Sequence, residues 1–279
     1  MERLPPAPPA RVSPWPLGRN HVEAVLGAGV RYPAHAFGEL DVTQALARIR
    51  FLQRELRQAL SVHAWLIHCL SRAVLAVPEV QSYRHGRRLV VMSVVDVGTI
   101  VERRVDGYRA PVAYVVRDAG SKSHAELQLE LRAAVRQQHR KQPLWQLLAR
   151  LPRFVRRALW RVVQSNPEWH RRHMMGTIGL TSLQLPGLDF PFCALPPTPH
   201  TLSLAVGSLA ERVALDTQGR PERRQVLLVG GAMDHLMIDG MTAARFAREF
   251  GSRVQGALDL DEAFAREMRE RRAALDADS

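Results

Sequence analysis

The residues with the clearest chemical potential lie in the segment GGAMDHLMIDGMTAARFAREF, residues 230–250. His235 stands four positions before Asp239, and Gly240 opens a run with helical periodicity. Three roles are open to His235: a satisfied core histidine, a metal ligand paired with Asp239, or a general base at the end of a strand. The metal role is disfavoured, because zinc takes three or four ligands and the sequence supplies no third ligand at a fixed local spacing. We therefore predict no metal site.

The elements that must position His235 are predicted from the sequence around it. The run VLLVGGAMDH predicts a strand that ends at the histidine, and the next helix is expected to start at about Asp239 or Gly240. His235 and Asp239 then lie on either side of a turn. Asp239 is a candidate helix N-cap, and Gly240 either permits the turn or allows close packing.

The rest of the chain predicts helices and strands in alternation. A short strand ends near Val42, and helices follow over about 43–57 and 61–76, the second stopped by Pro78. We predict a single mixed α/β domain over residues 19–279, preceded by a proline-rich extended or disordered arm at 1–18. The remaining predicted segments are the strands LVVMSVVDVGTIVE, APVAYVVRDA, MMGTIGLTSLQL, TLSLAVGSLAERVAL and RRQVLLVGGAMDH, and the helices SKSHAELQLELRAAVRQQHR, 241–256 and LDEAFAREMRERRAALDADS.

Composition limits the classes of partner. The net charge is +12, with 39 Lys and Arg against 27 Asp and Glu, and the only lysines are Lys122 and Lys141. An arginine surplus attracts polyanions such as acidic lipid or a phosphate-bearing cofactor, although it is also consistent with a merely basic surface. No recognisable nucleic-acid-binding motif is present, and we expect no nucleic-acid partner.

The location of the protein is predicted from the absence of targeting segments. The sequence has no apolar run of about 18 residues and no secretory signal, so we expect a cytoplasmic protein. Cys69 and Cys193 lie in apolar settings typical of reduced core thiols. Two isolated cysteines exclude a zinc site built on cysteine pairs.

Several segments carry a resemblance to one family. DHLMIDGMTAARFA resembles the DHxxxDGxxAAxF signature of the catalytic domain of the dihydrolipoyl acyltransferases of 2-oxo acid dehydrogenase complexes, and its HxxxDG core is shared with chloramphenicol acetyltransferase. The resemblance keeps the family's order from about residue 19 to 256. It implies the chloramphenicol acetyltransferase-like fold, a mixed α/β two-layer sandwich. The other similar segments are PAHAFGELDVTQALARIR, in which one residue separates Pro33 from His35, and SVHAWLIHCLSRAVLAVPEV, APVAYVVRDAGSKSHAEL, GTIGLTSLQLPGLDF and LAVGSL.

The resemblance also implies roles for the candidate site residues. His235 occupies the place of a general base that takes a proton from a thiol or hydroxyl acceptor, which then attacks the acyl-CoA thioester. Thr181 occupies the place of the hydroxyl that stabilises the oxyanion, and Ser182 takes that place if the register differs by one. Asp239 is expected to pair with an arginine near the N-terminus, for which Arg19 is the candidate, or to act as an N-cap. Coenzyme A or acyl-CoA is then the substrate.

Assembly and partners follow from the same resemblance. It implies a homotrimer in which the histidine of one chain and the hydroxyl of its neighbour form each active site. The charged C-terminal run REMRERRAALDADS provides no apolar anchor for a larger core, so the trimer is the expected end point. An alternative to the enzyme is a catalytically silent trimeric scaffold that recruits an anionic partner.

Two departures from the family pattern matter. No lipoyl domain precedes the matched region, so we expect no covalent lipoyl group, and a lipoyl protein in trans is a candidate partner. A basic helical insertion at about 143–172, interrupted at Pro152, is longer than the expected connection. It could be a lid over the acceptor tunnel, a contact with an anionic membrane surface, or a packed pair of surface helices.

Overall fold

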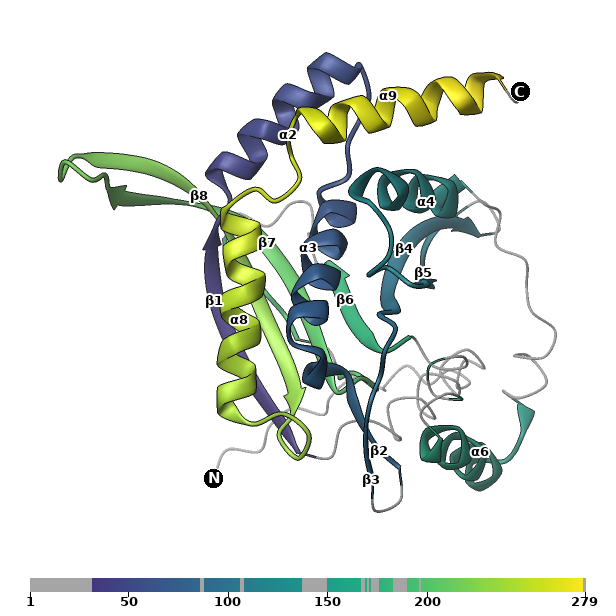
Figure 1. Ribbon diagram of the computed structural model, residues 1–279. Helices are drawn as coiled ribbons and strands as arrows, with labels where there is room; N and C mark the ends of the chain where they lie inside the picture. Colours follow the sequence, from purple (N-terminus) through teal and green to yellow (C-terminus); the bar gives the residue numbers. More distant parts are fainter. Residues whose placement is uncertain are drawn as a thin grey trace, which may run out of the picture.

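The fold is known from a computed structural model, which describes residues 32–85, 88–105, 108–136, 150–166, 169, 171, 176–182, 190–195 and 197–277 (Figure 1). The predicted arm at 1–18, Arg19 and a minor part of the predicted insertion at 143–172 lie outside these residues. In chain order the elements are β1 (Pro33–Asp41), α2 (Thr43–Leu56), α3 (Val62–Ala76), the 3-10 helix η1 (Pro78–Gln81), β2 (Ser82–His85), β3 (Arg88–Val91), β4 (Val97–Val105), β5 (Tyr108–Val116), α4 (His124–Arg136), α6 (Arg153–Ser165), β6 (Ile178–Ser182), β7 (Leu202–Leu215), β8 (Pro221–Asp234), α8 (Gly240–Gln255) and α9 (Glu262–Ala277).

The main sheet is mixed. Its six strands follow the order β1-β8-β7-β6-β4-β5, and β2 and β3 form a separate two-stranded sheet. β6 runs parallel to both of its neighbours, β4 and β7, whereas the other neighbouring pairs are antiparallel. The predicted mixed α/β fold is therefore confirmed.

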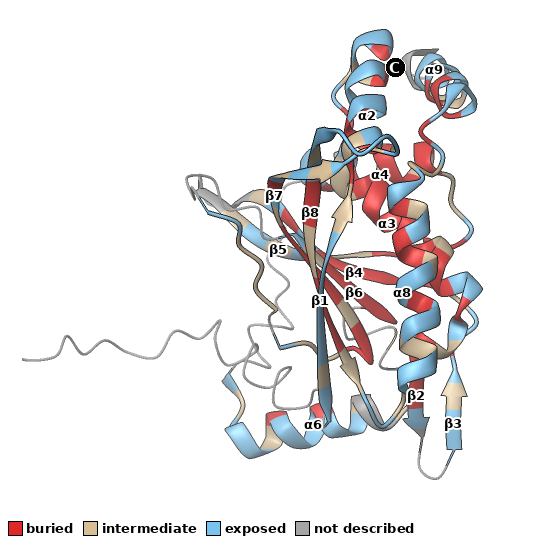
Figure 2. Ribbon diagram, turned by 90° about the vertical axis from the view of Figure 1, so that its left-hand side faces the viewer, coloured by how far each residue is buried: buried red, intermediate tan, exposed pale blue. Residues whose placement is uncertain are grey.

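Two of the helices form a layer on one face of this sheet. Figure 2 shows α3 and α8 beside each other, with buried residues concentrated between them and the strands. Leu40 of β1 faces Gly251 of α8, and Thr99 of β4 is hydrogen-bonded to His63 of α3. Because side chains alternate along a strand and cross-strand partners share a face, these contacts define a helix face and an opposite, outer face of the sheet.

Local sequence signals explain where the helices begin. The Ser61 hydroxyl accepts a hydrogen bond from the Ala64 N–H at the start of α3. At α4, the Ser123 hydroxyl accepts from the Glu126 N–H, and the Glu126 carboxylate accepts from the Ser123 N–H. This reciprocal pair is a capping box, which satisfies two amides that the first turn leaves without partners.

Part of the outer face of the sheet is covered by the segment that precedes β7. The Ser208 N–H donates to the Phe192 carbonyl at 2.8 Å. A Cβ at Gly207 would lie 2.3 Å from that same carbonyl oxygen, so only glycine allows the approach.

A two-stranded ribbon extends beyond the sheet. Past an irregularity between Val206 and Leu209, β7 pairs only with the first half of β8, and the ribbon projects away from the body in Figure 1. Val213 and Leu215 are exposed on it. Among the described helices, none is both long and apolar enough to cross a bilayer.

Candidate active site

His235 lies in the turn that follows β8. The Asp234 N–H donates to the Thr201 carbonyl, which holds the end of β8 against the start of β7. The His235 N–H donates to the Tyr32 carbonyl at 2.8 Å, and the Asp234 carboxylate accepts from the Leu236 N–H at 3.0 Å. The main chain of His235 is therefore fixed on both sides by hydrogen bonds.

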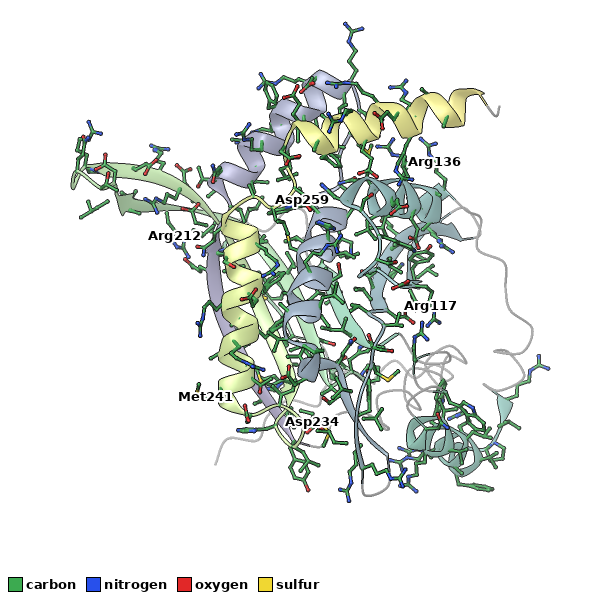
Figure 3. The ribbon with its side chains drawn as sticks, in the orientation of Figure 1. Arg117, Arg136, Arg212, Asp234, Met241 and Asp259 are labelled. Carbon is green, nitrogen blue, oxygen red and sulfur yellow. The ribbon has the colours of Figure 1, made fainter. Side chains whose placement is uncertain are left out.

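The side chain of His235 is exposed. The core role left open by the sequence therefore does not apply to it. Three apolar residues that are hydrogen-bonded to the main chain of His235, as Tyr32 is, or that follow it in the sequence are exposed as well: Tyr32 is 59% exposed, Leu236 50% and Met241 74%. Figure 3 shows Asp234 and Met241 at the same end of the sheet and of α8. We call Tyr32, Leu236 and Met241 the apolar rim of His235.

Asp239 is the N-cap of α8. Its carboxylate accepts a hydrogen bond from the Thr242 N–H at 2.7 Å, and this hydrogen bond lowers the pKa of the carboxyl. The N-cap role predicted for Asp239 is thus present, and it accounts for the start of the helix. Its other predicted partner, Arg19, lies outside the described residues.

Gly240 differs from the prediction. It does not have a positive φ, and a Cβ at this position would meet no atom within 4 Å. Neither the turn nor close packing therefore requires glycine within this chain. The N-cap geometry at Asp239 produces the turn with ordinary backbone angles.

Thr181 and Ser182 lie at the end of β6, where the strand leaves the buried part of the sheet. Thr181 is half-buried and Ser182 is exposed. Leu180 pairs with Thr99 on the helix face, so Thr181 points to the outer face and Ser182 to the helix face. The two candidates for the oxyanion donor therefore present their hydroxyls on opposite sides of the sheet.

The structure does not bring Thr181 and His235 of one chain together. Thr181 lies opposite Ala205 of β7, and Ala205 lies opposite Gly230 of β8. The end of β8 at Asp234 lies about 13 Å further along the strand direction and about 10 Å to the side, and His235 follows it. Side chains that far apart cannot contact one reacting atom.

Two other residues with chemical potential, His63 and Cys69, belong to the interior of the fold. His63 Nε2 is hydrogen-bonded to the Thr99 hydroxyl at 2.6 Å, and burial lowers the pKa of His63 to about 4. Burial also raises the pKa of the Cys69 thiol. In the described ranges, no three His, Cys, Asp or Glu side chains are grouped so that they could hold a metal ion.

Sequence reasoning missed two groups of residues. The apolar rim escaped notice because Tyr32, Leu236 and Met241 do not share a short motif; only their exposure reveals them. A second group surrounds the fully buried Asp96, whose carboxylate accepts from Arg117 and Arg171, each at 2.8 Å. An acidic residue within a valine-rich strand region was the available signal for that ion-pair cluster.

Comparisons with known proteins identify the fold. No protein-family model matches the sequence, and no curated protein matches it. Among solved structures, a dihydrolipoamide acetyltransferase from Azotobacter vinelandii superposes with a TM-score of 0.63 at 19% identity, covering 92% of this chain and 99% of that one. That structure was determined to investigate the roles of a serine, a histidine and an asparagine in the catalytic mechanism.

Two further structures agree with it. A probable dihydrolipoamide acetyltransferase from Listeria monocytogenes gives a TM-score of 0.62 at 15% identity, with 90% of this chain and 96% of that chain covered. The cubic core of a pyruvate dehydrogenase multienzyme complex gives 0.62 at 17% identity, with 92% and 99% covered. The chain therefore has the fold of dihydrolipoamide acetyltransferase catalytic cores, as its motifs predicted.

Proposed function

We propose that this protein is an acyltransferase that moves an acyl group between coenzyme A and a thiol or alcohol acceptor. The observation that carries the proposal is the place of His235 in this fold. It is an exposed histidine in the turn after β8, four positions before the aspartate that caps α8. An exposed imidazole is a side chain suited to general-base chemistry.

The Azotobacter vinelandii enzyme supports the choice of residues. Its histidine is followed four positions later by asparagine, and its serine precedes the histidine by nearly the same separation as Ser182 and Thr181 precede His235. Asp239 stands here where that enzyme has asparagine. Either side chain can cap a helix, so the substitution keeps the turn geometry.

The proposed reaction has two proton transfers through His235. A ring nitrogen takes the proton of the acceptor S–H or O–H as the acceptor atom attacks the thioester carbonyl carbon. The carbonyl oxygen becomes an oxyanion that accepts a hydrogen bond from the Thr181 hydroxyl. Collapse breaks the bond to the coenzyme A sulfur, which receives the proton from the imidazolium. The products are acylated acceptor and free coenzyme A.

We propose that two chains form each site. Thr181 and His235 of one chain lie too far apart to act together, and the apolar rim of His235 is exposed when the chain is considered by itself. A neighbouring chain that covers the apolar rim and supplies its own Thr181 would bury these side chains and place a hydroxyl beside His235. A closed trimer with head-to-tail contacts has this property, because each interface pairs one surface with a different one.

The acceptor is tested by turnover. Acetyl-CoA and free dihydrolipoamide are incubated with the protein, and coenzyme A formation is followed by chromatography. We expect enzyme-dependent formation of coenzyme A and acetylated acceptor. Turnover with dihydrolipoamide attached to a separate lipoyl protein, but not with the free compound, would show that the acceptor is carried by a partner protein in trans. No turnover with any thiol or alcohol acceptor by a protein that forms trimers would instead favour the silent scaffold.

A further inference from the structure

Helix α6 lies within the most one-sided charged region of the chain. Residues 131–167 contain nine arginine and lysine residues and no aspartate or glutamate. α6 (Arg153–Ser165) is the helix of this region that the structure describes beyond α4, and it lies apart from the helix layer in Figure 1. Its surroundings therefore combine strong positive charge with a helical surface.

The orientation of α6 is the reverse of that of an ordinary amphipathic helix. Arg156 and Trp160 are its buried side chains, each 8% exposed. Phe154 is 74% exposed, Val162 53% and Leu159 43%. At about 100° per residue these three fall on one arc of the helix surface, away from the arc of Arg156 and Trp160.

Helix α8 shows the contrast. It buries Phe246, Phe250 and Val254 against the rest of the protein, as a helix with an apolar stripe normally does. α6 instead directs its apolar stripe outward. An exposed apolar stripe marks a surface that another phase or molecule covers.

A row of positive charge borders the stripe. Arg153, Arg157 and Arg161 follow one another at four-residue spacing and are exposed. Arg161 lies next to Phe154 around the helix axis, about 20° away. Charged heads beside an apolar arc are the arrangement of helices that lie in the plane of a membrane surface, where the stems of the arginines stay near the acyl chains and the guanidinium groups reach phosphate.

We propose that α6 docks this protein onto the surface of an anionic lipid bilayer. Phe154, Leu159 and Val162 enter the region between headgroups and acyl chains, and Arg157 and Arg161 contact lipid phosphates. Charge favours lipid over a second copy of the chain. Each copy carries a net charge of +12, so a contact between copies at this row would bring like charges together.

The proposal is tested by co-sedimentation of the full-length protein with vesicles. Vesicles of phosphatidylcholine with phosphatidylglycerol are compared with pure phosphatidylcholine, at low and at physiological salt. We expect binding to the anionic vesicles that weakens with salt, because screening shortens the range of the attraction. Reversing two charges, in R157E/R161E, should weaken binding by roughly ten-fold or more.

Matched variants distinguish the apolar stripe of α6 from exposed apolar or basic side chains elsewhere on the protein. Phe154→Ser should lower binding to anionic vesicles, whereas Phe51→Ser on α2 and Arg266→Glu on α9 should leave it unchanged. Phe51 is 52% exposed and Arg266 is exposed, at elements far from α6 in Figure 1. Unchanged thermal unfolding of Phe154→Ser would show that the variant is folded.

Three results would overturn the proposal. The first is no binding of the wild type to anionic vesicles at low salt. The second is loss of vesicle binding in Phe51→Ser or Arg266→Glu to the same extent as in Phe154→Ser. The third is a Phe154→Ser protein that binds vesicles as the wild type does but sediments as a smaller assembly, which would make the stripe a contact between subunits.

Discussion

His235 lies in surroundings opposite to those of His68 and His124. His235 is exposed after the last strand, and a backbone hydrogen bond to Tyr32 positions its main chain. His68 of α3 and His124 of α4 are buried. His68 Nε2 donates to the Asp259 carboxylate at 2.6 Å, and the His124 ring stacks on Phe264 with centroids 4.1 Å apart.

The buried pair joins distant parts of the chain. Asp259 lies between α8 and α9, so its hydrogen bond ties that connection to α3, while His124 belongs to α4. Burial lowers the pKa of His68 and lowers that of His124 to about 4. Both rings are therefore neutral near pH 7 and act in structure. His235, which is exposed in one chain, is the histidine to which we assign the chemical role in the proposed two-chain site.

The largest expected effect is on the exposed histidine. His235→Ala should lower kcat/KM for acyl transfer by about 10²- to 10⁴-fold, since it removes the proposed general base. The unfolding midpoint should stay near the wild-type value because the side chain is exposed. Steady-state kinetics and chemical denaturation measure the two effects. An active His235→Ala protein would contradict the assignment of His235 as the general base. The contrast between a catalytic histidine and two structural ones would then no longer hold.

The hydroxyl donor should show a smaller loss. Thr181→Ala is expected to lower kcat by about 10²-fold, the usual loss of one oxyanion donor. Ser182→Ala is the matched control, because its hydroxyl lies on the other face of the sheet. Equal losses in both variants, or a loss in Ser182→Ala alone, would move the donor to Ser182.

Complementation tests whether the two residues come from different chains. His235→Ala and Thr181→Ala proteins are mixed in equal amounts during refolding. About a quarter of the sites should then pair an intact histidine with an intact threonine, and activity should return in that proportion. Mixed trimers recovered by tagged co-purification but without activity would place both groups in one chain, or exclude Thr181.

His124 should contribute to the loss of stability in acid, together with His63 and His68, whose pKa values burial also lowers. In the unfolded chain His124 has the usual pKa of 6.5, whereas in the folded protein it is about 4. Below pH 6.5 the unfolded state therefore binds a proton that the folded state does not, so the free energy of unfolding falls as the pH decreases toward 4. For this group the loss is about 2 kcal/mol between pH 7 and pH 5. Urea denaturation at the two pH values measures it.

A variant distinguishes this contribution from that of other groups. His124→Gln cannot be protonated, so its free energy of unfolding should change less between pH 7 and pH 5 than that of the wild type. A variant whose pH dependence equals that of the wild type would show that His124 is not responsible. Acyl transfer at pH 7 should be retained, in contrast to His235→Ala.

The smallest expected effect is at the helix cap. Asp239→Ala removes the acceptor for the Thr242 N–H and should lower the Tm by about 2 °C. Activity should fall as well, because the turn that carries His235 ends at this cap. Asp239→Asn keeps an acceptor and should restore most of both. An unchanged Tm in Asp239→Ala would mean that the cap contributes nothing measurable.

The sequence predicted the elements well where local chemistry decides them. The helix that starts near Ser61, its end before Pro78 and the strand that ends before His235 are set by neighbours within a few residues. The distance between Thr181 and His235 could not be predicted in this way. It depends on the strand order β6-β7-β8 and on the parallel pairing of β6 with β7, and both arise from contacts between distant segments.

Which side of α6 faces the protein could not be predicted from the sequence either. Helical periodicity places Phe154, Leu159 and Val162 on one face, but it cannot show whether that face points inward. Gly240 gave a misleading signal for a similar reason. A glycine after an aspartate favours an unusual backbone conformation, yet the cap at Asp239 allows ordinary angles here.

The pairing of β1 with β8 constrains how the protein forms during synthesis. β1 (Pro33–Asp41) has β8 (Pro221–Asp234) as its partner in the sheet, so its hydrogen bonds wait until almost the whole chain has left the ribosome. Loop closure over such a separation is slow, and an unpaired strand with exposed amides is prone to associate with other chains. β1, the first strand to be synthesised, is thus among the last to form its hydrogen bonds in the sheet. We expect holdase chaperones to bind the nascent chain until β8 has been made.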